Sequence, residues 1–447
     1  MAGARQAALR TLHAVDTRGA YADLALESVL QGLPELTGPD RRLATELAYG
    51  TVRRQNTLDW ALSRYLNRPL ASCDPWVRAA LRLGAYQLLY MENIPGPVAV
   101  NETVKLLHRQ PRWLTGLVNA VLRRLSRHRA EELPYPALDE SPAQHLALVH
   151  SHPEWIVAVF LDRIGLEETA SLCRWNNQPP RLTVRINTLR TGVDAFTRCL
   201  DAEGIRWKTG LHHPAAVELL APGNIRQVPG FAQGHFQVQD EASMIVAQLL
   251  DPKSGQEVLD ACAAPGGKAM HLAELVGVDG RVVANDINEQ RLQLIRENAL
   301  RLGLCHVEVT QGDARRLPQG WVFDRVLLDA PCSGLGVLAR RPDARWRKKP
   351  RHIPGLTRLQ RELLEGASAC VRPGGVLVYS VCTLTGPEGP GVVEGFLQDH
   401  PQFRLDDPRP WLPSSLTGAV TDRGYVELWP QRHGTDGFFM ARLAKYT

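Results

Sequence analysis

The stretch Asp260-Ala-Cys-Ala-Ala-Pro-Gly-Gly-Lys268 decides the fold class of this chain. It lies between a strand-like run at 258–262 and a helical pattern at 268–276, so we interpret it as a glycine-rich turn from a strand into a helix. Glycines let the backbone approach a ligand closely, and the N–H groups that begin a helix attract a carboxylate or phosphate. The turn therefore predicts an α/β ligand-binding domain.

The alternation of strands and helices continues outward from this turn. We expect strands at 281–287, 307–310, 323–329 and 376–381, and helices at 290–302 and 356–371, the last closed by Pro373-Gly-Gly375. Two antiparallel edge strands are expected near Val426 and Phe439. This order predicts a parallel, doubly wound sheet whose ligand lies beyond the carboxyl ends of its strands.

Upstream of the turn, the chain changes character twice. Residues 1–140 repeat apolar positions at helical spacing, which predicts a helical domain, and the proline-rich stretch 133–142 marks its end. Residues 141–240 contain a helical linker and then short strands at 182–186, 217–220 and 236–238 around a helix at 194–203, which predicts a small α+β domain. Residues 241–447 form the third predicted domain.

Three kinds of ligand compete for the glycine turn. A phosphate-binding loop needs a glycine where Cys262 lies and a Ser or Thr where Ala269 lies, and the dinucleotide pattern Gly-x-Gly-x-x-Gly is absent. A mononucleotide-like ligand fits, because Asp286 follows Gly266 by 20 residues, the usual offset of a ribose-binding acid. A glycine-rich turn without a ligand is the alternative.

Two further motifs place cysteines at the ends of predicted strands. Asp329-Ala-Pro-Cys-Ser-Gly334 follows one strand and Tyr379-Ser-Val-Cys-Thr383 ends the next. A thiolate is a strong nucleophile. This arrangement suits methylation of a pyrimidine carbon: a thiolate adds to carbon 6, carbon 5 then attacks a sulfonium methyl group, and a carboxylate near N3 stabilises the charge that develops. The cysteines at 73, 173, 199, 305 and 370 are expected to be ordinary small apolar residues.

Composition excludes several other classes of protein. The 447 residues are 44% hydrophobic and 22% charged, which excludes a disordered or collagen-like chain, and the net charge is only +5. No apolar run approaches the length of a membrane span, and the first residues do not resemble a signal peptide. The eight cysteines include no Cys-x-x-Cys pair, so we expect reduced thiols, a cytoplasmic protein and no metal site.

The motifs together resemble a known family. Asp-Ala-Cys-Ala-Ala-Pro-Gly-Gly-Lys, Asp-Ala-Pro-Cys-Ser-Gly and Tyr-Ser-Val-Cys-Thr are similar to the motifs of the Nop/Sun family of RNA cytosine-5 methyltransferases. The stretches 43–53, 80–90 and 116–123 resemble the RNA-binding fold of the antiterminator NusB. The resemblance covers nearly the whole chain. It implies a NusB-like all-α domain, a small α+β (RRM-like) domain and a Rossmann-like methyltransferase domain.

The resemblance also implies roles for individual residues. Cys382 would be the nucleophile, Cys332 would assist product release, and Asp329 would contact both the cofactor region and the target cytosine. S-adenosylmethionine would be held by Asp286, by Asp313 and by the turn residues Cys262, Ala263, Ala264, Pro265, Gly266, Gly267 and Lys268. Arg291 either lines the cofactor site or is an ordinary exposed helix residue.

Clustered basic residues indicate where RNA could bind. The run that follows Cys332 carries Arg340, Arg341, Arg345, Trp346, Arg347, Lys348 and Lys349, and a predicted helix carries Arg123 and Arg124 among Lys105, Arg109, Arg112, Arg127 and Arg129. Such clusters contact phosphates, and a tryptophan stacks on a base; solvated surfaces are the alternative. The target cytosine must be unpaired, which favours a hairpin loop as substrate. The resemblance implies that this loop belongs to small-subunit (16S) ribosomal RNA, and we expect a monomeric protein.

The sequence departs from the family pattern around the nucleophile. Val381 stands where the family usually has Thr, and Pro387-Glu-Gly-Pro390 replaces a usual Asn-Glu pair. A non-catalytic RNA-binding ribosome-assembly factor that has lost turnover is therefore one alternative. A methyltransferase for another RNA such as tRNA is a second. A DNA cytosine-5 methyltransferase that uses Cys332 as nucleophile is a third, but the two cysteine motifs and the NusB-like unit argue against it.

Overall fold

The computed structural model describes residues 3–108 and 110–446 and divides the chain into two compact units. One unit contains Met1–Gln178 together with Leu338–Lys348, and the other contains Pro179–Val337 together with Lys349–Thr447. Arg109, which belongs to the predicted basic cluster, lies outside the described residues. The predicted boundaries at residues 140 and 240 stay predictions.

The first unit is helical, as its apolar spacing predicted. Its main core gathers Leu47, Leu58, Leu81, Val118 and Leu122, all fully or almost fully buried. Asp74 caps the central helix by accepting hydrogen bonds from the N–H groups of Trp76 and Val77, which satisfies the first turn. The α-helices of this unit are α1 Ala4–Arg18, α2 Ala22–Gln31, α3 Gly38–Arg53, α4 Gln55–Ser63, α5 Pro75–Tyr90, α6 Gly96–Lys105, α7 Arg112–Leu125, α8 Pro142–Val149, α9 Glu154–Trp175 and α14 Ala344–Arg347.

The second unit begins with a small antiparallel sheet. Its strand order is β2-β3-β1-β4, and α10 (Val193–Ala202) covers it with Phe196 and Leu200. β2 is a strand that the sequence analysis missed, because its three residues are half-exposed or exposed and show no apolar alternation. The strands are β1 Thr183–Ile186, β2 Trp207–Thr209, β3 Ala216–Leu219 and β4 Phe236–Val238.

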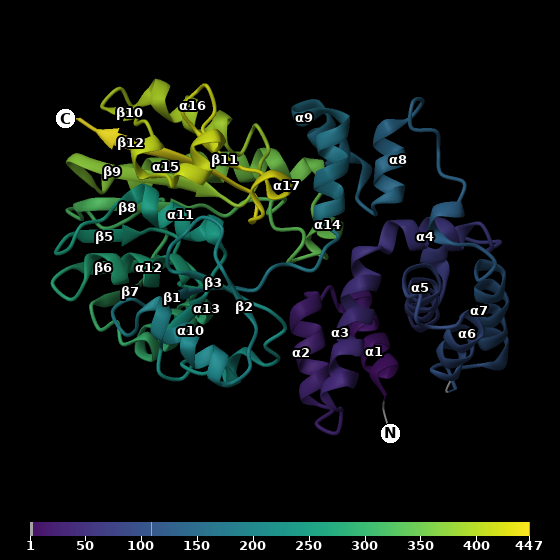
Figure 1. Cartoon of the computed structure of the whole chain (residues 1–447). Helices are drawn as coiled ribbons and strands as arrows, with labels where there is room; N and C mark the ends of the chain where they lie inside the picture. The colour runs from purple at the N-terminus through teal and green to yellow at the C-terminus, as the bar shows by residue number, and fades with distance from the viewer. Residues whose placement is uncertain (1–2, 109, 447) are drawn as a thin grey trace. The chain divides into compact units, whose positions relative to one another are not determined.

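The larger sheet carries the predicted parallel strands. Within the described residues its order is β10-β12-β9-β8-β5-β6-β7, with β11 paired to β12, and Figure 1 shows β9, β8, β5, β6 and β7 stacked in that order. The parallel strands are β5 Glu257–Asp260, β6 Arg281–Asp286, β7 Val307–Gln311, β8 Phe323–Asp329 and β9 Val371–Val381. The antiparallel edge is formed by β10 Phe403–Leu405, β11 Val426–Leu428 and β12 Phe438–Lys445.

Helices cover both faces of this sheet, so the expected doubly wound fold is confirmed. Successive strand residues alternate between two cores: Val258 and Val282 face one, and Leu259 and Val283 face the other. The first core contains side chains of α11 Glu241–Leu250, α12 Gly267–Val276 and α13 Glu289–Leu302. The second contains side chains of α15 Ile353–Ala369 and α16 Pro390–Asp399; the short α17 spans Pro430–His433.

One local prediction was wrong. Pro373-Gly-Gly375 was expected to close the preceding helix, but α15 ends at Ala369 and these residues lie inside β9. The pairing of β8 with β9 shifts register there, from Phe323 opposite Val371 to Arg325 opposite Val376. The extra residues form a bulge, which accommodates a proline and two glycines that a regular ladder would not.

The small sheet and the larger sheet of the second unit share buried polar contacts. Arg185 is 1% exposed and donates to the Glu274 carboxylate, at 2.6 Å from Nη2 to Oε1. Asn187 donates to the backbone oxygen of Leu302. Because a buried charge without its partner is costly, these contacts fix the small sheet against α12 and α13.

In the described part of the chain, no helix has the length and apolar character that crossing a membrane requires.

Candidate active site

The carboxyl ends of the parallel strands bring the predicted residues together. Asp260 ends β5, Asp286 ends β6, Asp329 ends β8, and Cys382 follows β9. The chain runs from β5 through β6 to β7 on one side of β5 and returns to β8 on the other, so the sheet reverses its order at β5. A reversal of this kind is where open α/β sheets bind ligands.

The glycine turn is built by backbone contacts to β6. The N–H of Ala264 donates to Asp286 Oδ2 at 3.0 Å, and the N–H of Asn288 donates to Asp286 Oδ1 at 2.9 Å. Gly266 has a φ of +103°, which is open to glycine and strained for other residues. These contacts orient the Asp286 carboxylate while leaving it acceptor capacity for a ligand.

Asn285 supports the same turn, and the sequence analysis missed it. Its side-chain amide donates to the backbone oxygens of Ala261 and Gly312, both at 3.0 Å. It thereby ties the segments that follow β5 and β7 to β6. Nothing in the sequence distinguishes this asparagine from an ordinary strand residue.

Lys268 and Asp329 form an ion pair inside the site. Lys268 Nζ lies 2.6 Å from Asp329 Oδ2, and the Ser380 hydroxyl donates to Asp329 Oδ1 at 2.8 Å. Burial opposes the charge on Lys268, but the attraction of Asp329 outweighs it, so the pKa of Lys268 is raised. The lysine that the sequence placed in the cofactor turn therefore holds the carboxylate expected to meet the substrate.

Asp260 is a buried acid that was quoted in the motif but given no role. It is 1% exposed, and its carboxyl oxygens have no hydrogen-bond partner among the described residues beyond a weak contact with the N–H of Cys262. Burial, reinforced by the negative charge of Asp329, raises the pKa of Asp260 to about 8. Asp260 is thus mostly protonated at neutral pH.

The two predicted cysteines lie in contact. Cys332 Sγ and Cys382 Sγ are 3.3 Å apart, and neither is in a disulfide. The hydrogen bond with Cys382 and burial raise the pKa of Cys332 well above its ordinary value. Cys332 is therefore held as a thiol next to Cys382, and Cys382 also interacts electrostatically with the Lys268 ammonium group.

Glu388 connects the loops that carry these cysteines. Its fully buried carboxylate accepts from the Ser333 N–H at 2.7 Å, the Ser333 hydroxyl at 2.6 Å, the Thr385 hydroxyl at 2.9 Å and Gln360 Nε2 at 3.2 Å. Ser333 follows Cys332, and Thr385 lies in the loop after Cys382. The segment noted as a departure from the family pattern therefore contains the carboxylate that fixes both loops.

The remaining cofactor candidates are closer to solvent. Asp313 accepts from the guanidinium group of Arg315 at 2.7 Å, and this hydrogen bond lowers the pKa of Asp313. Arg291 is exposed on α13, so its assignment to the cofactor site stays a prediction.

The basic run after Cys332 is placed differently from what we expected. Arg345 is fully buried and donates to the backbone oxygens of Ser151 at 2.9 Å and Asn176 at 3.0 Å, and to the Asn177 side chain at 3.0 Å. This placement does not favour the predicted RNA contact of Arg345, because its guanidinium group is buried and already donates to other residues. It anchors the segment Leu338–Lys348 within the helical unit.

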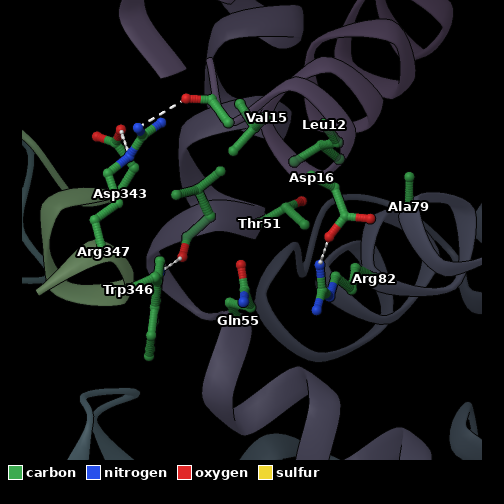
Figure 2. A pocket seen from close by; sticks show the side chains of 12 residues that line it. Leu12, Val15, Asp16, Thr51, Gln55, Ala79, Arg82, Asp343, Trp346 and Arg347 are labelled. Carbon is green, nitrogen blue, oxygen red and sulfur yellow. Dashed lines mark hydrogen bonds and ion pairs between the residues drawn. The ribbon is translucent and has the colours of Figure 1, made fainter. Parts of the chain in front are cut away.

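Its neighbours are similarly engaged. Trp346 donates its indole N–H to the Val52 oxygen at 2.7 Å, and Arg347 pairs with Asp343 at 3.1 Å and donates to the Gly19 oxygen. Figure 2 shows Trp346 and Arg347 lining a cavity of about 220 Å³ within the helical unit. Arg340 and Lys348 are half-buried and Arg341 and Lys349 exposed, as are Arg123 and Arg124 on α7, and their RNA contacts stay predictions.

Comparison with known proteins gives a consistent result. Residues 247–444 match the family described as 16S rRNA methyltransferase RsmB/F, residues 2–127 match the NusB family, and residues 152–226 match the RsmF/B-like ferredoxin-like domain. A curated relative from Synechocystis sp., named "Probable ribosomal RNA small subunit methyltransferase B", is 40% identical over 100% of both chains.

Solved structures agree. The crystal structure of PH0851 has a TM-score of 0.84 and 28% identity, and the match covers 98% of this chain and 99% of that one. The crystal structure of NSun6 from Pyrococcus horikoshii with SFG has a TM-score of 0.60 and 25% identity, covering 66% of this chain and 98% of that one. The resemblance carried by the three motifs is thus confirmed, and the chain belongs to the RsmB/F family of S-adenosylmethionine-dependent 16S rRNA methyltransferases.

Proposed function

We propose that this protein methylates carbon 5 of an unpaired cytosine in 16S ribosomal RNA, with Cys382 as nucleophile and S-adenosylmethionine as methyl donor. The observation that carries the proposal is the 3.3 Å contact between Cys382 and Cys332 beside the Lys268–Asp329 ion pair. Cys382, Cys332 and Asp329 lie at one edge of the sheet, next to the glycine turn, as these proposed roles require.

The residues around the turn fit the proposed cofactor. The oriented Asp286 carboxylate can accept from ribose hydroxyls, and Asp260 offers two buried oxygens without good partners. A side-chain carbon at Gly267 would meet no atom within 4 Å, so the turn presents bare backbone to open space. Asp313 would complete this set. When bound, the cofactor supplies an electrophilic methyl group on a sulfonium centre.

Cys382 would open the reaction by adding to carbon 6 of the cytosine. The new S–C6 bond moves the electron pair of the C5=C6 bond to carbon 5, and that carbon takes the methyl group. Asp329, fixed by Lys268 and Ser380, would accept a hydrogen bond from N3 of a ring that has taken a proton from solvent at N3. The carboxylate would stabilise the positive charge of this protonated ring, which makes carbon 6 a better target for the thiolate. The Lys268 ammonium group can balance the negative charge of a Cys382 thiolate.

Release of the product reverses the addition. A base removes the proton from carbon 5, the C5=C6 bond forms again, and Cys382 leaves with the electrons of the S–C6 bond. Cys332 rests as a thiol in hydrogen-bond contact with Cys382 and would assist this elimination. Loss of Cys332 should therefore leave the RNA attached to Cys382.

The test uses isotopically labelled S-adenosylmethionine and an unmodified transcript of 16S rRNA. We expect label in 5-methylcytidine with the wild type, none with Cys382→Ala, and a denaturant-stable protein–RNA adduct with Cys332→Ala. An adduct that forms through Cys332 would reverse the two roles and favour the mechanism of DNA enzymes. RNA binding without label would favour an assembly factor. Label that appears only in tRNA would show that tRNA, and not 16S rRNA, is the substrate.

A further inference from the structure

A groove in the helical unit lies between α6 and α7, and the sequence motifs did not reveal it. Its volume is about 770 Å³. Asn101 on α6 and Arg112, Asn119 and Arg123 on α7 provide its polar groups, and the other side chains that line it are apolar or hydroxyl-bearing. Among the described residues that line the groove, none is acidic. The groove is therefore positively charged and rich in hydrogen-bond donors.

The two arginines of this groove are free to bind a ligand. Both Arg112 and Arg123 are exposed, and within residues 3–108 and 110–446 no side-chain hydrogen bond or ion pair engages either guanidinium group. Lys105, at the end of α6, is by contrast paired with Glu102 at 2.7 Å. Two unpaired cations without a nearby acid in the groove favour an anionic ligand.

The spacing along α7 fits an extended ligand. Arg112, Gly116, Asn119 and Arg123 follow one another at intervals of three or four residues, so they share one face of the helix. Arg112 and Arg123 are separated by eleven residues, or about 16 Å at 1.5 Å per residue. The two guanidinium groups can thus reach phosphates several nucleotides apart.

Gly116 keeps the middle of this face flat. Glycine inside a helix is unfavourable compared with alanine, and here a side-chain carbon would meet no protein atom within 4 Å. Packing within the described chain therefore does not require a glycine at this position. A ligand backbone lying close against the helix would require one.

A tryptophan directly follows the first of these arginines in the sequence. Trp113, in the first turn of α7, is 65% exposed, which is unusual for so large an apolar side chain. An exposed aromatic ring next to a row of cations is the combination that binds single-stranded nucleic acid, with the bases on the ring and the phosphates on the cations.

We propose that this groove binds the sugar–phosphate backbone of an unpaired segment of the substrate RNA. Arg112 and Arg123 would contact phosphates, Asn101 and Asn119 would bind 2′-hydroxyl or phosphate oxygens, and Trp113 would stack on a base. The inference rests on the proposed function in that the RNA is the methyl acceptor, and it adds a second attachment point, in the helical unit, for that RNA.

The first test removes the two cations from the full-length protein. Arg112→Gln/Arg123→Gln should weaken binding of the unmodified 16S rRNA transcript about tenfold or more at about 0.1 M salt. The slope of log affinity against log salt should flatten by about 1.4, because each single-strand phosphate contact contributes about 0.7. The control Arg10→Gln/Arg68→Gln removes the same charge from two other exposed arginines and should change the slope by much less. Equal effects in the two double variants would overturn the groove in favour of diffuse attraction.

The second test changes shape without changing charge. Gly116→Gln should fold like the wild type, because its side chain points into open space, but it should fill the groove and raise the KM for RNA. Trp113→Ala should lower RNA affinity about tenfold. Thermal unfolding by circular dichroism checks that the variants are folded. If Gly116→Gln and Trp113→Ala bind RNA as tightly as the wild type, the proposal is wrong. An acidic protein would then be the remaining candidate ligand of the groove.

The two proposals fail in different ways. If the wild type transfers no label to RNA but the groove variants still lose affinity, the proposed reaction is wrong and the groove stands. If the wild type forms 5-methylcytidine and the groove variants bind and react as it does, the reaction stands and the groove is wrong.

Discussion

The loop that carries Cys332 and the basic run that begins at Arg340 are neighbours in the sequence, but they are fixed by opposite kinds of contact. In the cysteine loop, side chains hold other side chains: Glu388 binds Ser333, and Cys332 meets Cys382. In the basic run, the guanidinium group of Arg345 donates hydrogen bonds to backbone oxygens of the helical unit. The first arrangement holds the two cysteine sulfur atoms next to each other. In the second, the guanidinium group that suggested a ligand is already bonded to protein oxygens.

The same contrast separates Arg345 from Arg123. Both arginines belong to clusters that look alike in the sequence, yet one is fully buried and the other is exposed on the wall of a groove. A cation can bind RNA only with donors that the fold has not already used. A basic cluster therefore predicts an RNA-binding surface only where its donors are not already bonded to other protein groups.

The largest effect on stability is expected at Arg345. Arg345→Met keeps the length of the side chain but leaves the buried oxygens of Ser151 and Asn176 without donors, so we expect a loss of about 3 kcal/mol or more in the free energy of unfolding. Urea unfolding followed by circular dichroism measures this loss. The matched change Arg341→Met, at an exposed site, should stay within about 0.5 kcal/mol. A stable Arg345→Met protein with weakened RNA binding would contradict the anchoring role.

The next effect concerns the carboxylate that fixes the cysteine loops. Glu388→Ala removes the acceptor of the Ser333 N–H and of the Thr385 hydroxyl, and one of the two acceptors of Gln360 Nε2. The cysteines should therefore lose their alignment, and kcat should fall about 100-fold. Glu388→Gln keeps one acceptor oxygen and should recover part of the rate.

A purely structural role would predict a different pattern. In the Cys332→Ala background, the yield of trapped RNA adduct should fall with Glu388→Ala and recover in part with Glu388→Gln, at temperatures where each variant is folded. Glu394→Ala, which removes an exposed carboxylate paired with Arg423, should leave the yield unchanged. Full adduct formation by Glu388→Ala would show that the loops are aligned without it.

Much of the site follows from the sequence because parallel strands share one edge. Asp329, Cys332 and Cys382 were expected at one edge because each lies at or just after the end of a strand. Asp329 ends β8, and the two cysteine sulfur atoms are in contact. The Lys268–Asp329 pair was not predicted, because it depends on β5 lying next to β8 and not only on the order of the chain. Glu388 was missed because its importance lies in partners that come from three separate segments.

The same limit explains the basic run. Sequence gives the charge of Arg345 but not the backbone oxygens that accept its hydrogen bonds, which belong to Ser151 and Asn176, 194 and 169 residues away in the chain. It also gives the helical stripe of α7 but not the groove beside it, which needs the position of α6. Helices and strands depend on local sequence and were mostly predicted. The hydrogen-bond partners of buried polar groups depend on the whole fold and were not.

Asp260, at the carboxyl end of β5, is a buried carboxyl group without the hydrogen-bond donors that Glu388 has. Its pKa is raised to about 8 in the folded protein, against about 4 in the unfolded chain. The stability that this group contributes is therefore fully present below about pH 4 and is lost as the pH rises toward 8, by at most about 1.4 kcal/mol per pH unit.

Asp260→Asn removes this titration. Between pH 5 and pH 8, unfolding of the wild type should become easier relative to the variant as the pH rises, as urea titrations of the two cofactor-free proteins at several pH values would measure. The change Asp313→Asn, at a carboxylate whose pKa is lowered by Arg315, should not reproduce this slope. Parallel pH profiles for wild type and Asp260→Asn would place a charged carboxylate at position 260.

The smallest effect is expected at Trp346, and it decides whether the basic run has any direct part in RNA binding. Trp346→Phe keeps an aromatic ring but removes the N–H that donates to the Val52 oxygen, so the free energy of unfolding should fall by about 1 kcal/mol. Because the ring lines a cavity of the helical unit, RNA affinity should stay within about twofold. Trp113→Ala, on the exposed turn of α7, should give the opposite pattern, with RNA affinity lost and stability kept. If Trp346→Phe instead lowered RNA affinity at unchanged stability, the basic run would regain its predicted role in RNA binding. Hydrogen bonding of the donors within the protein would then no longer distinguish the basic run from the arginines of the α7 groove.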